Sequence, residues 1–251
     1  MTGGQTPQRR LFRRDSSDTT ANPRPTLVLL AGPNGAGKTT FINRFLRQRA
    51  EAFRFVNPDE VARDLEGDGA SRDLAAGRLV LERLDALFIE QADVVLETTL
   101  ATRSHAPRIR RFKAAGYRVE LIYLRPPSAD FSVARVARRV AEGGHGIPED
   151  TLRRRFALSL DYLETAYKPL VDAWEVYASS DDGLELLDLG TEMKMLFDRE
   201  TVLKAGRDAA RIAREGTREE KSGKFLPPPG WKGRLVTAAD VPAAPRKKKT
   251  A

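Results

Sequence analysis

The stretch GPNGAGKTT, residues 32–40, constrains the fold of this chain more than any other segment. It follows the continuous apolar run TLVLLAG, residues 26–32, which is typical of a central strand in a parallel sheet. The stretch matches G-x-x-x-x-G-K-[ST] at every defined position, between a strand and an expected helix. The sequence therefore predicts an α/β fold with a phosphate-binding loop after its first strand.

Each defined residue of this loop has a physical role. Gly32, Gly35 and Gly37 let the backbone curve around phosphate oxygens with its N–H groups pointing inward. Lys38 supplies a cation for the β- and γ-phosphates, and the Thr39 hydroxyl is the expected Mg²⁺ ligand. The predicted ATP-binding residues are Gly32, Pro33, Asn34, Gly35, Ala36, Gly37, Lys38, Thr39 and Thr40.

Strand and helix patterns alternate after the loop. Strands are expected at 26–32, 53–56, 94–97, 117–125, 174–179 and 184–189. Helices are expected at 38–49, 71–91, 103–115, 129–142, 149–168 and 194–214. This alternation predicts a P-loop NTPase-type, mostly parallel sheet with helices on both faces. The pair at 129–142 and 149–168 is expected to form a helical, arginine-bearing lid.

The formal net charge of +8 is concentrated at one end of the chain. Residues 201–251 hold 13 of the basic and 5 of the acidic residues, so residues 1–200 are electrically balanced. We therefore divide the chain into a flexible N-terminal extension (1–24), a P-loop kinase domain (25–215) and a basic, Pro/Gly-containing flexible tail (216–251). Nucleic acid is expected to make at most weak contact, through this tail.

Neither cysteines nor an apolar run of about 20 residues occurs in the sequence. These features predict a cytoplasmic protein without disulfides or a membrane partner. The sequence also lacks an LSGGQ-like signature, an apolar strand ending in Asp-Glu, and N-K-x-D. It therefore fits neither an ABC-type ATPase nor a GTPase, and a compact kinase-like pattern is left.

The segment VNPDEVAR, residues 56–63, follows the second expected strand. Because parallel strands end at one edge of the sheet, Asp59 is expected beside the P-loop. Asp59 would accept the proton of an acceptor hydroxyl or support the Mg²⁺ shell; the alternative is that it only caps the next helix. Asn57 would steady the turn or contact the substrate.

The third expected strand runs into LETTLATRSH, residues 96–105. Glu97, Thr98 and Thr99 offer a carboxylate and two hydroxyls at the same edge, suited to sugar hydroxyls or to the surroundings of Mg²⁺. Glu97, Thr98 and Arg103 are assigned to the substrate side. The alternative is that the threonines cap the next helix and Glu97 pairs with a nearby arginine. His105 is interpreted as structural.

Arginines flank the glycine loop between the two lid helices. On the first lid helix Val133, Val136, Ala137 and Val140 form an apolar stripe, from which the arginines fall away. Cations at this place would reach the transferring phosphoryl group. Arg139 and one of Arg154 and Arg155 are therefore assigned catalytic roles, and Arg135 has a supporting, substrate-binding role. The pattern leaves open which of Arg154 and Arg155 contacts the phosphate, while Arg138 and Arg153 are expected to matter less. A solvated basic face is the alternative.

The motifs GPNGAGKTT, NPDEVAR, ETTL with RSH, and the segment 135–156 together resemble the zeta-toxin family of P-loop kinases, in its short bacterial branch. The resemblance spans roughly residues 26–180. It implies an ATP- and Mg²⁺-dependent kinase that phosphorylates the sugar 3′-hydroxyl of UDP-N-acetylglucosamine and is restrained by an antitoxin protein. By matching motifs, Asp59 would be the general base, Lys38 the P-loop lysine and Glu97 a substrate-side residue.

Three other functions stay open on the sequence. One is a metabolic kinase for a small alcohol, and another is a nucleic-acid end kinase that uses the basic tail. The third is a binding module whose ATP pocket switches a partner surface without phosphoryl transfer.

Overall fold

The computed structural model describes most of the chain between its two ends. The described residues are 24–42, 53–63, 65, 69–144, 146–190, 200, 203–204, 206–208, 211, 215 and 234–235. Residues 43–49 and most of the helix expected at 194–214 lie outside them, as does His145 in the glycine loop. No helix of the described part has both the length and the apolar character needed to cross a bilayer.

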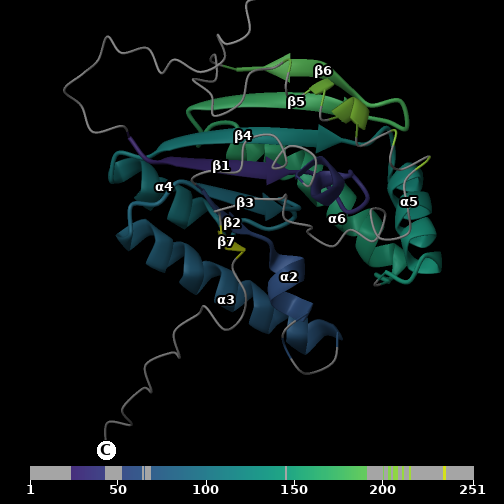
Figure 1. Ribbon diagram of the computed structural model, residues 1–251, viewed down its shortest axis with the longest axis horizontal. Coiled ribbons are helices and arrows are strands. Elements are labelled where there is room, and N and C mark those ends of the chain that lie inside the picture. Colours follow the sequence, from purple (N-terminus) through teal and green to yellow (C-terminus); the bar gives the residue numbers. More distant parts are fainter. Residues whose placement is uncertain are drawn as a thin grey trace, which may run out of the picture.

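Seven strands of the described residues form one sheet in the order β6-β5-β4-β1-β3-β2-β7 (Figure 1). Their bounds are β1 Thr26–Ala31, β2 Arg54–Val56, β3 Val94–Thr98, β4 Arg118–Arg125, β5 Ala173–Ser179, β6 Leu184–Leu189 and β7 Arg234–Leu235. All neighbours pair in parallel except β6, which is antiparallel to β5. The predicted mostly parallel sheet is thereby confirmed, and six strands lie where the sequence indicates. The seventh, β7, gives no signal because it is only two residues long.

The helices fall close to the expected positions. Their bounds are α2 Pro58–Arg63, α3 Gly69–Ile89, α4 Ala106–Ala114, α5 Ala129–Ala141 and α6 Glu149–Tyr162, with a π-helical turn at Leu163–Tyr167 after α6. A further helix begins at Lys38 and is described through residue 42. The helix expected from residue 103 begins three residues later, with a proline in its first turn.

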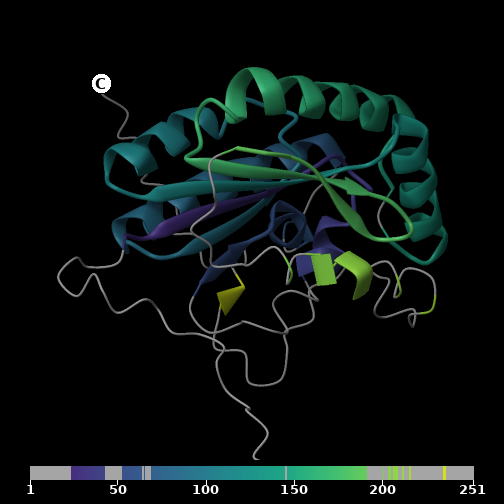
Figure 2. The same ribbon diagram turned by 90° about the horizontal axis from the view of Figure 1, so that it is seen from above.

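Alternate side chains of β1 feed two separate cores. Leu27 and Leu29 pack with α3, α4 and the π-helical turn on one face of the sheet. Val28 and Leu30 pack on the other face with Phe41, from the helix that begins at Lys38. Seen from above, α6 and α4 cover one side of the sheet (Figure 2). The prediction of helices on both faces is confirmed.

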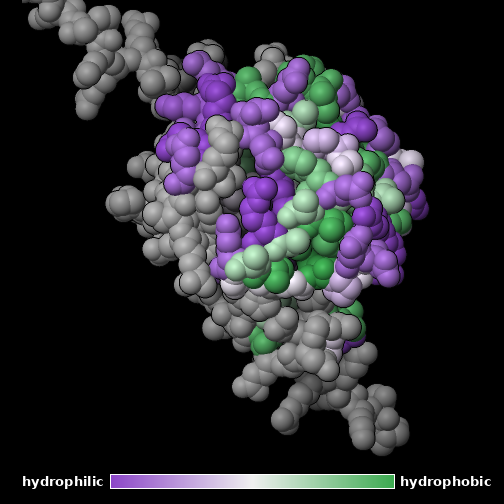
Figure 3. All heavy atoms as spheres, turned by 90° about the vertical axis from the view of Figure 1, so that its right-hand side faces the viewer, coloured by the Kyte–Doolittle hydropathy of each residue, from purple (hydrophilic) through white to green (hydrophobic). Residues whose placement is uncertain are grey.

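The carboxyl ends of the parallel strands meet on the side of the sheet where α5 lies (Figure 1). This end faces the viewer in Figure 3, where strongly hydrophilic residues gather in the middle of the surface. A doubly covered parallel sheet leaves its ligand-binding crevice at this edge. The fold thus brings the described loops that follow β1, β2, β3, β4 and β5 to one place.

The expected apolar stripe on α5 is correct only for the first part of the helix. Val136 is buried and Val133 half-buried, whereas Ala137 is exposed and Val140 is 41% exposed. The buried residues of α5 are Ser132 and Val136, which lie in its first two turns. The buried part of the stripe therefore ends before Val140.

Candidate active site

The P-loop leaves β1 in a conformation that requires glycine. Gly32 has φ +145°, and a Cβ there would lie 2.3 Å from the carbonyl oxygen of Leu124 on β4. Its own N–H donates to the carbonyl of Thr98 at 3.2 Å, which ties the loop to the end of β3. Gly35 has φ +78°, and its Cβ would lie 2.7 Å from the backbone oxygen of Ser132 on α5. The loop is therefore enclosed by two strands and one helix.

Lys38 folds back over the loop. Its Nζ donates to the carbonyls of Gly32 at 2.8 Å and Pro33 at 3.0 Å, and the residue is 7% exposed. Burial lowers the pKa of the Lys38 ammonium, and the nearby carboxylates of Glu97 and Asp59 oppose that shift. The structure thus places a desolvated cation within the loop that is expected to hold phosphate.

Glu97, at the end of β3, faces the first turn of the helix that begins at Lys38. The Thr39 hydroxyl lies 3.1 Å and 3.3 Å from the two carboxylate oxygens of Glu97 and donates to them. Glu97 is 5% exposed, and burial raises its pKa to about 7 although the Lys38 cation acts in the other direction. The Thr39 hydroxyl therefore lies beside a carboxyl group that changes its protonation state near neutral pH.

This donor set fits Mg²⁺. A magnesium ion is usually held by one or two protein oxygens together with nucleotide phosphates and water, rather than by a cage of side chains. The described residues contain no group of three His, Cys, Asp or Glu side chains that could hold a metal alone. The Thr39 hydroxyl would bind the ion directly, with the Glu97 carboxylate orienting that hydroxyl.

Asp59 reaches the same site from the first turn of α2. The side-chain oxygen of Asn57 accepts the N–H of Asp59 at 2.8 Å, and Asn57 is 1% exposed. Asn57 thus makes the helix-capping hydrogen bond considered for Asp59, and it steadies the turn rather than facing the cavity. The Asp59 carboxylate lines the cavity that Lys38, Thr39 and Glu97 also line.

One cavity connects these groups with α5 and with the turn between β5 and β6. Its sequence-predicted lining residues are Asn34, Gly35, Ala36, Gly37, Lys38, Thr39, Thr40, Asp59, Glu97, Arg135 and Arg139. Arg138, which was expected to matter less than Arg139, also lines the cavity. The sequence did not indicate the residues that complete the lining, which are Phe41, Leu124, Glu142, Ser179, Ser180, Gly183, Leu184 and Gly206. Ser179 ends β5 and Ser180 follows it, so their place at this edge of the sheet, though not their contacts with the P-loop, could have been predicted from the expected strand.

Other predicted site residues lie outside the lining of this cavity. The Thr98 hydroxyl accepts the N–H of Leu100 at 3.1 Å, and the exposed Arg103 guanidinium lies 4.8 Å from the ring centre of Tyr162. Arg154 is exposed on α6 and Arg155 is half-buried. The structure therefore brings together the P-loop, Asp59, Glu97 and the arginines of α5, but not those of α6.

Arg153 makes a different connection from its neighbours. Its guanidinium lies 2.7 Å from the carboxylate of Asp130 on α5 and 2.7 Å from that of Glu149 in its own helix. This link is on the surface, where an ion pair contributes little to stability. Arg153 thus joins α5 to α6 away from the cavity.

The strand, the glycine loop and the cavity next to them define a P-loop nucleotide-binding protein of kinase-like α/β fold. The chain belongs to the AAA domain family, which its residues 27–164, more than half of its length, match.

Two curated proteins are similar to this chain at sequence identities below 30%. An uncharacterized protein of Haemophilus influenzae is 28% identical over 130 residues, which cover 51% of this chain and 91% of that protein. A protein named guanylate kinase of Streptomyces coelicolor is 27% identical over 205 residues, or 70% of this chain and 95% of that protein. With identities this low, the family assignment rests on the domain match.

Two solved structures illustrate the range of similar folds. A structure from the PezAT chromosomal toxin-antitoxin system of Streptococcus pneumoniae is 16% identical, covers 81% of this chain and 84% of that one, and has a TM-score of 0.49. Shikimate kinase from Acinetobacter baumannii is 17% identical, with coverage of 74% and 89% and a TM-score of 0.40.

Proposed function

We propose that this chain transfers the γ-phosphoryl group of ATP to a sugar hydroxyl of a nucleotide-sugar such as UDP-N-acetylglucosamine. The observation that supports this most is the meeting of Lys38, Thr39, Glu97 and Asp59 in one cavity beside the P-loop. A cation, a metal-binding hydroxyl and a separate carboxylate are the groups that phosphoryl transfer to an alcohol requires.

The residues divide the reaction between them. The loop N–H groups and the Lys38 ammonium hold the phosphates, and Asp59 accepts the proton of the acceptor hydroxyl. That hydroxyl oxygen then forms a bond to the γ-phosphorus, while the bond to the β–γ bridging oxygen breaks and ADP leaves with the electron pair. Mg²⁺ held by the Thr39 hydroxyl would neutralise part of the negative charge of the phosphates.

The arginines of α5 extend this proposal. Arg139 and Arg138 both line the cavity, and a cation there would stabilise the charge that develops on the transferring group. For Arg154 and Arg155 the catalytic role stays a proposal that requires α6 to move toward the cavity. Residues 25–215 are proposed to form the catalytic unit.

The motif resemblance also supports a biological role. We propose that the protein is the toxin of a toxin–antitoxin pair, with an antitoxin protein as its partner. Expression and coexpression test this role. The wild type should arrest growth, and Lys38→Ala should not. Coexpression of a small protein encoded by an adjacent gene should relieve the arrest. Growth unaffected by the wild type would contradict it.

The acceptor is tested with a panel of four compounds. Purified protein is incubated with ATP and Mg²⁺ and with UDP-N-acetylglucosamine, GMP, a simple sugar alcohol or a 5′-hydroxyl oligonucleotide, and products are followed by mass. GMP is included because the Streptomyces coelicolor relative is named guanylate kinase. Phosphorylation of the UDP-sugar is the expected result. Transfer to another acceptor alone would replace the nucleotide-sugar proposal, and ATP binding without transfer would favour the binding module.

A further inference from the structure

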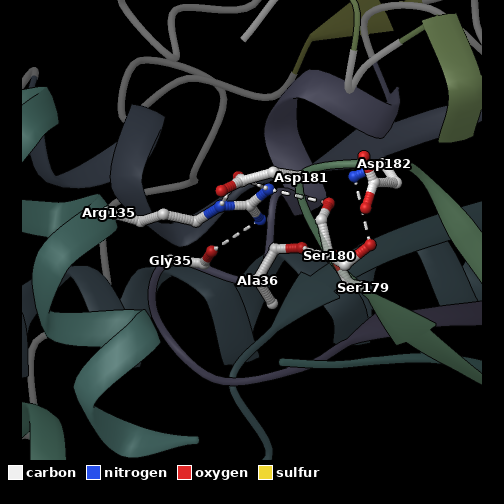
Figure 4. Close-up of polar contacts among 7 residues, drawn as sticks. All are labelled: Gly35, Ala36, Arg135, Ser179, Ser180, Asp181 and Asp182. Atoms are coloured by element: carbon white, nitrogen blue, oxygen red, sulfur yellow. Dashed lines mark hydrogen bonds and ion pairs between the residues drawn. The ribbon is translucent and has the colours of Figure 1, made fainter. Parts of the chain in front are cut away.

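Arg135 on α5 contacts the P-loop and the turn between β5 and β6 (Figure 4). Its Nη1 donates to the carbonyl of Gly35 at 3.3 Å, and its Nη2 donates to the carbonyl of Ser180 at 3.0 Å. The carboxylate of Asp181 accepts from Nη2 at 2.9 Å and from Nε at 3.2 Å. All three guanidinium nitrogens therefore already donate to protein oxygens.

A second side chain holds the next carbonyl of the loop. The Ser179 hydroxyl, at the end of β5, donates to the carbonyl oxygen of Ala36 at 2.8 Å and is buried. In a trans peptide the C=O and the N–H point in opposite directions. Holding the carbonyl of Ala36 thus fixes the direction of the Gly37 N–H. The N–H of Ala36 donates to the carbonyl of Pro33 at 3.2 Å, so the hydrogen bond from Arg135 to the Gly35 carbonyl fixes the peptide that closes this turn of the loop.

The turn between β5 and β6 gives this arrangement a firm base. Within it the N–H of Ser180 donates to the carbonyl of Gly183 at 3.0 Å, and the N–H of Asp182 donates to the Ser180 hydroxyl at 3.1 Å. The guanidinium of Arg135 also lies 4.5 Å from the ring centre of Phe131, one turn earlier on α5. The charge of Arg135 is thereby paired and its plane is fixed on two sides.

We propose that Arg135 is a positioning residue that fixes the turn of the P-loop from which its phosphate-binding N–H groups project, with Asp181 fixing Arg135 and Ser179 acting in parallel on the peptide of Gly37. The inference rests on the proposed function in one respect, that the cavity holds the phosphates of ATP. It differs from direct binding, in which the Arg135 guanidinium would itself contact a phosphate.

The two arrangements predict opposite effects of Asp181→Asn. If Arg135 bound phosphate directly, removing the neighbouring negative charge would strengthen ATP binding by reducing repulsion. If Arg135 acts by positioning, the substitution releases the guanidinium and weakens ATP binding by about tenfold, as the loss of a charge-assisted hydrogen bond would. Arg135→Lys, which keeps the charge but not the fork of donors, should weaken binding by a similar factor.

The experiment measures ATP dissociation constants of the full chain by titration calorimetry for wild type, Arg135→Lys, Asp181→Asn and their combination. The double variant should bind no more weakly than the weaker single variant, because Asp181 acts through Arg135. Ser179→Ala should weaken binding by about threefold independently, because it releases a different carbonyl. Thermal unfolding without nucleotide shows which variants are folded.

A matched control is the ion pair of Arg153 with Asp130, which also joins two elements but lies away from the cavity. Arg153→Lys and Asp130→Asn should leave ATP affinity unchanged.

Unchanged or tighter ATP binding by Asp181→Asn would overturn the positioning role, and so would an additive double variant. Because binding is measured rather than turnover, a wild type that binds ATP but phosphorylates no acceptor would overturn only the proposed function. A wild type that binds no ATP would overturn both. If Asp181→Asn fails to fold, the ATP affinities of Arg135→Lys and Ser179→Ala provide the test. Wild-type ATP affinity in both variants would overturn the proposal.

Discussion

Glu97 is a buried carboxyl group that titrates near neutral pH in the folded protein. Burial raises its pKa to about 7 from an ordinary value of 4.5, and the carboxylates of Asp59 and Glu60 act in the same direction. Between these two pH values the folded protein holds a proton that the unfolded chain has lost. The free energy of unfolding should therefore fall as pH rises from about 4.5 to about 7, by about 1.4 kcal/mol per pKa unit.

Urea unfolding of wild type and Glu97→Gln from pH 5 to pH 8 checks this expectation. The difference between the two free energies of unfolding should change across this range and level off above about pH 7, because only the wild type carries the titrating group. His105 acts in the opposite direction, since burial lowers its pKa to about 4, but it is present in both proteins and cancels in the difference. A pH-independent difference would contradict the assigned ionisation.

At this scale the sequence predicted the residues whose chemistry follows from a local pattern. Lys38, Thr39 and Asp59 lie in short motifs next to strand ends, and the structure brings them together. It could not predict that Ser179 holds the carbonyl of Ala36, because 143 residues separate the two. Such a contact depends on which strands are neighbours, and a single serine carries no pattern that reveals it.

The elements around the P-loop are packed closely enough to restrict substitution. The backbone of Ser132 on α5 lies 2.7 Å from where a Cβ on Gly35 would be, and Gly35 has φ +78°. Gly35→Ala should therefore abolish detectable ATP binding and lower the free energy of unfolding by about 1–3 kcal/mol through backbone strain. ATP titration and urea unfolding measure both effects.

Gly77 on α3 is the matched control, because a Cβ there would have no atom within 4 Å apart from its chain neighbours and the nearby backbone of its own helix. Gly77→Ala should raise the free energy of unfolding by about 0.5–1 kcal/mol, as expected for a helix interior, and leave ATP affinity unchanged. Equal effects of the two substitutions would show that the packing of α5 on the loop does not govern the site.

Hydrophobic periodicity predicted where the helices and strands lie along the chain. It did not predict which residues of α5 and α6 face the cavity. A stripe shows which face of a helix is apolar, but not how far along the helix its packing neighbours extend. The stripe therefore did not predict that Val140, near the end of α5, is 41% exposed. Three consecutive arginines on α6 point in different directions, and the pattern alone does not tell which of them faces a ligand. The exposed position of Arg154 and the link made by Arg153 required the packing of both helices.

On the scale of the whole molecule, charge and chemistry are separated along the chain. Every described residue that lines the cavity lies at or before Gly206, whereas residues 207–251 hold 12 basic and 5 acidic residues and so carry most of the excess positive charge. A chain ending at residue 235 should therefore keep the wild-type ATP affinity, measured by calorimetry at two salt concentrations. A large loss would show that the basic end contributes to the nucleotide site.

A chain ending at residue 215 additionally lacks β7, which pairs with Arg54 and Phe55 of β2. This truncation should lower the free energy of unfolding relative to the 235-residue chain, because it leaves the edge of β2 without its neighbour. Identical stability of the two truncated chains would show that β7 contributes nothing to the sheet.

The most direct test of the central claim is the rate of phosphoryl transfer in Asp59→Asn. Single-turnover reactions with ATP, Mg²⁺ and the acceptor found in the panel are compared with ATP affinities of the same proteins. General-base catalysis contributes about 10²–10⁴-fold, so transfer should slow by that factor while ATP affinity stays within about threefold of the wild type. Wild-type transfer rates in Asp59→Asn would contradict the assignment of this cavity as the place where Asp59 activates a hydroxyl.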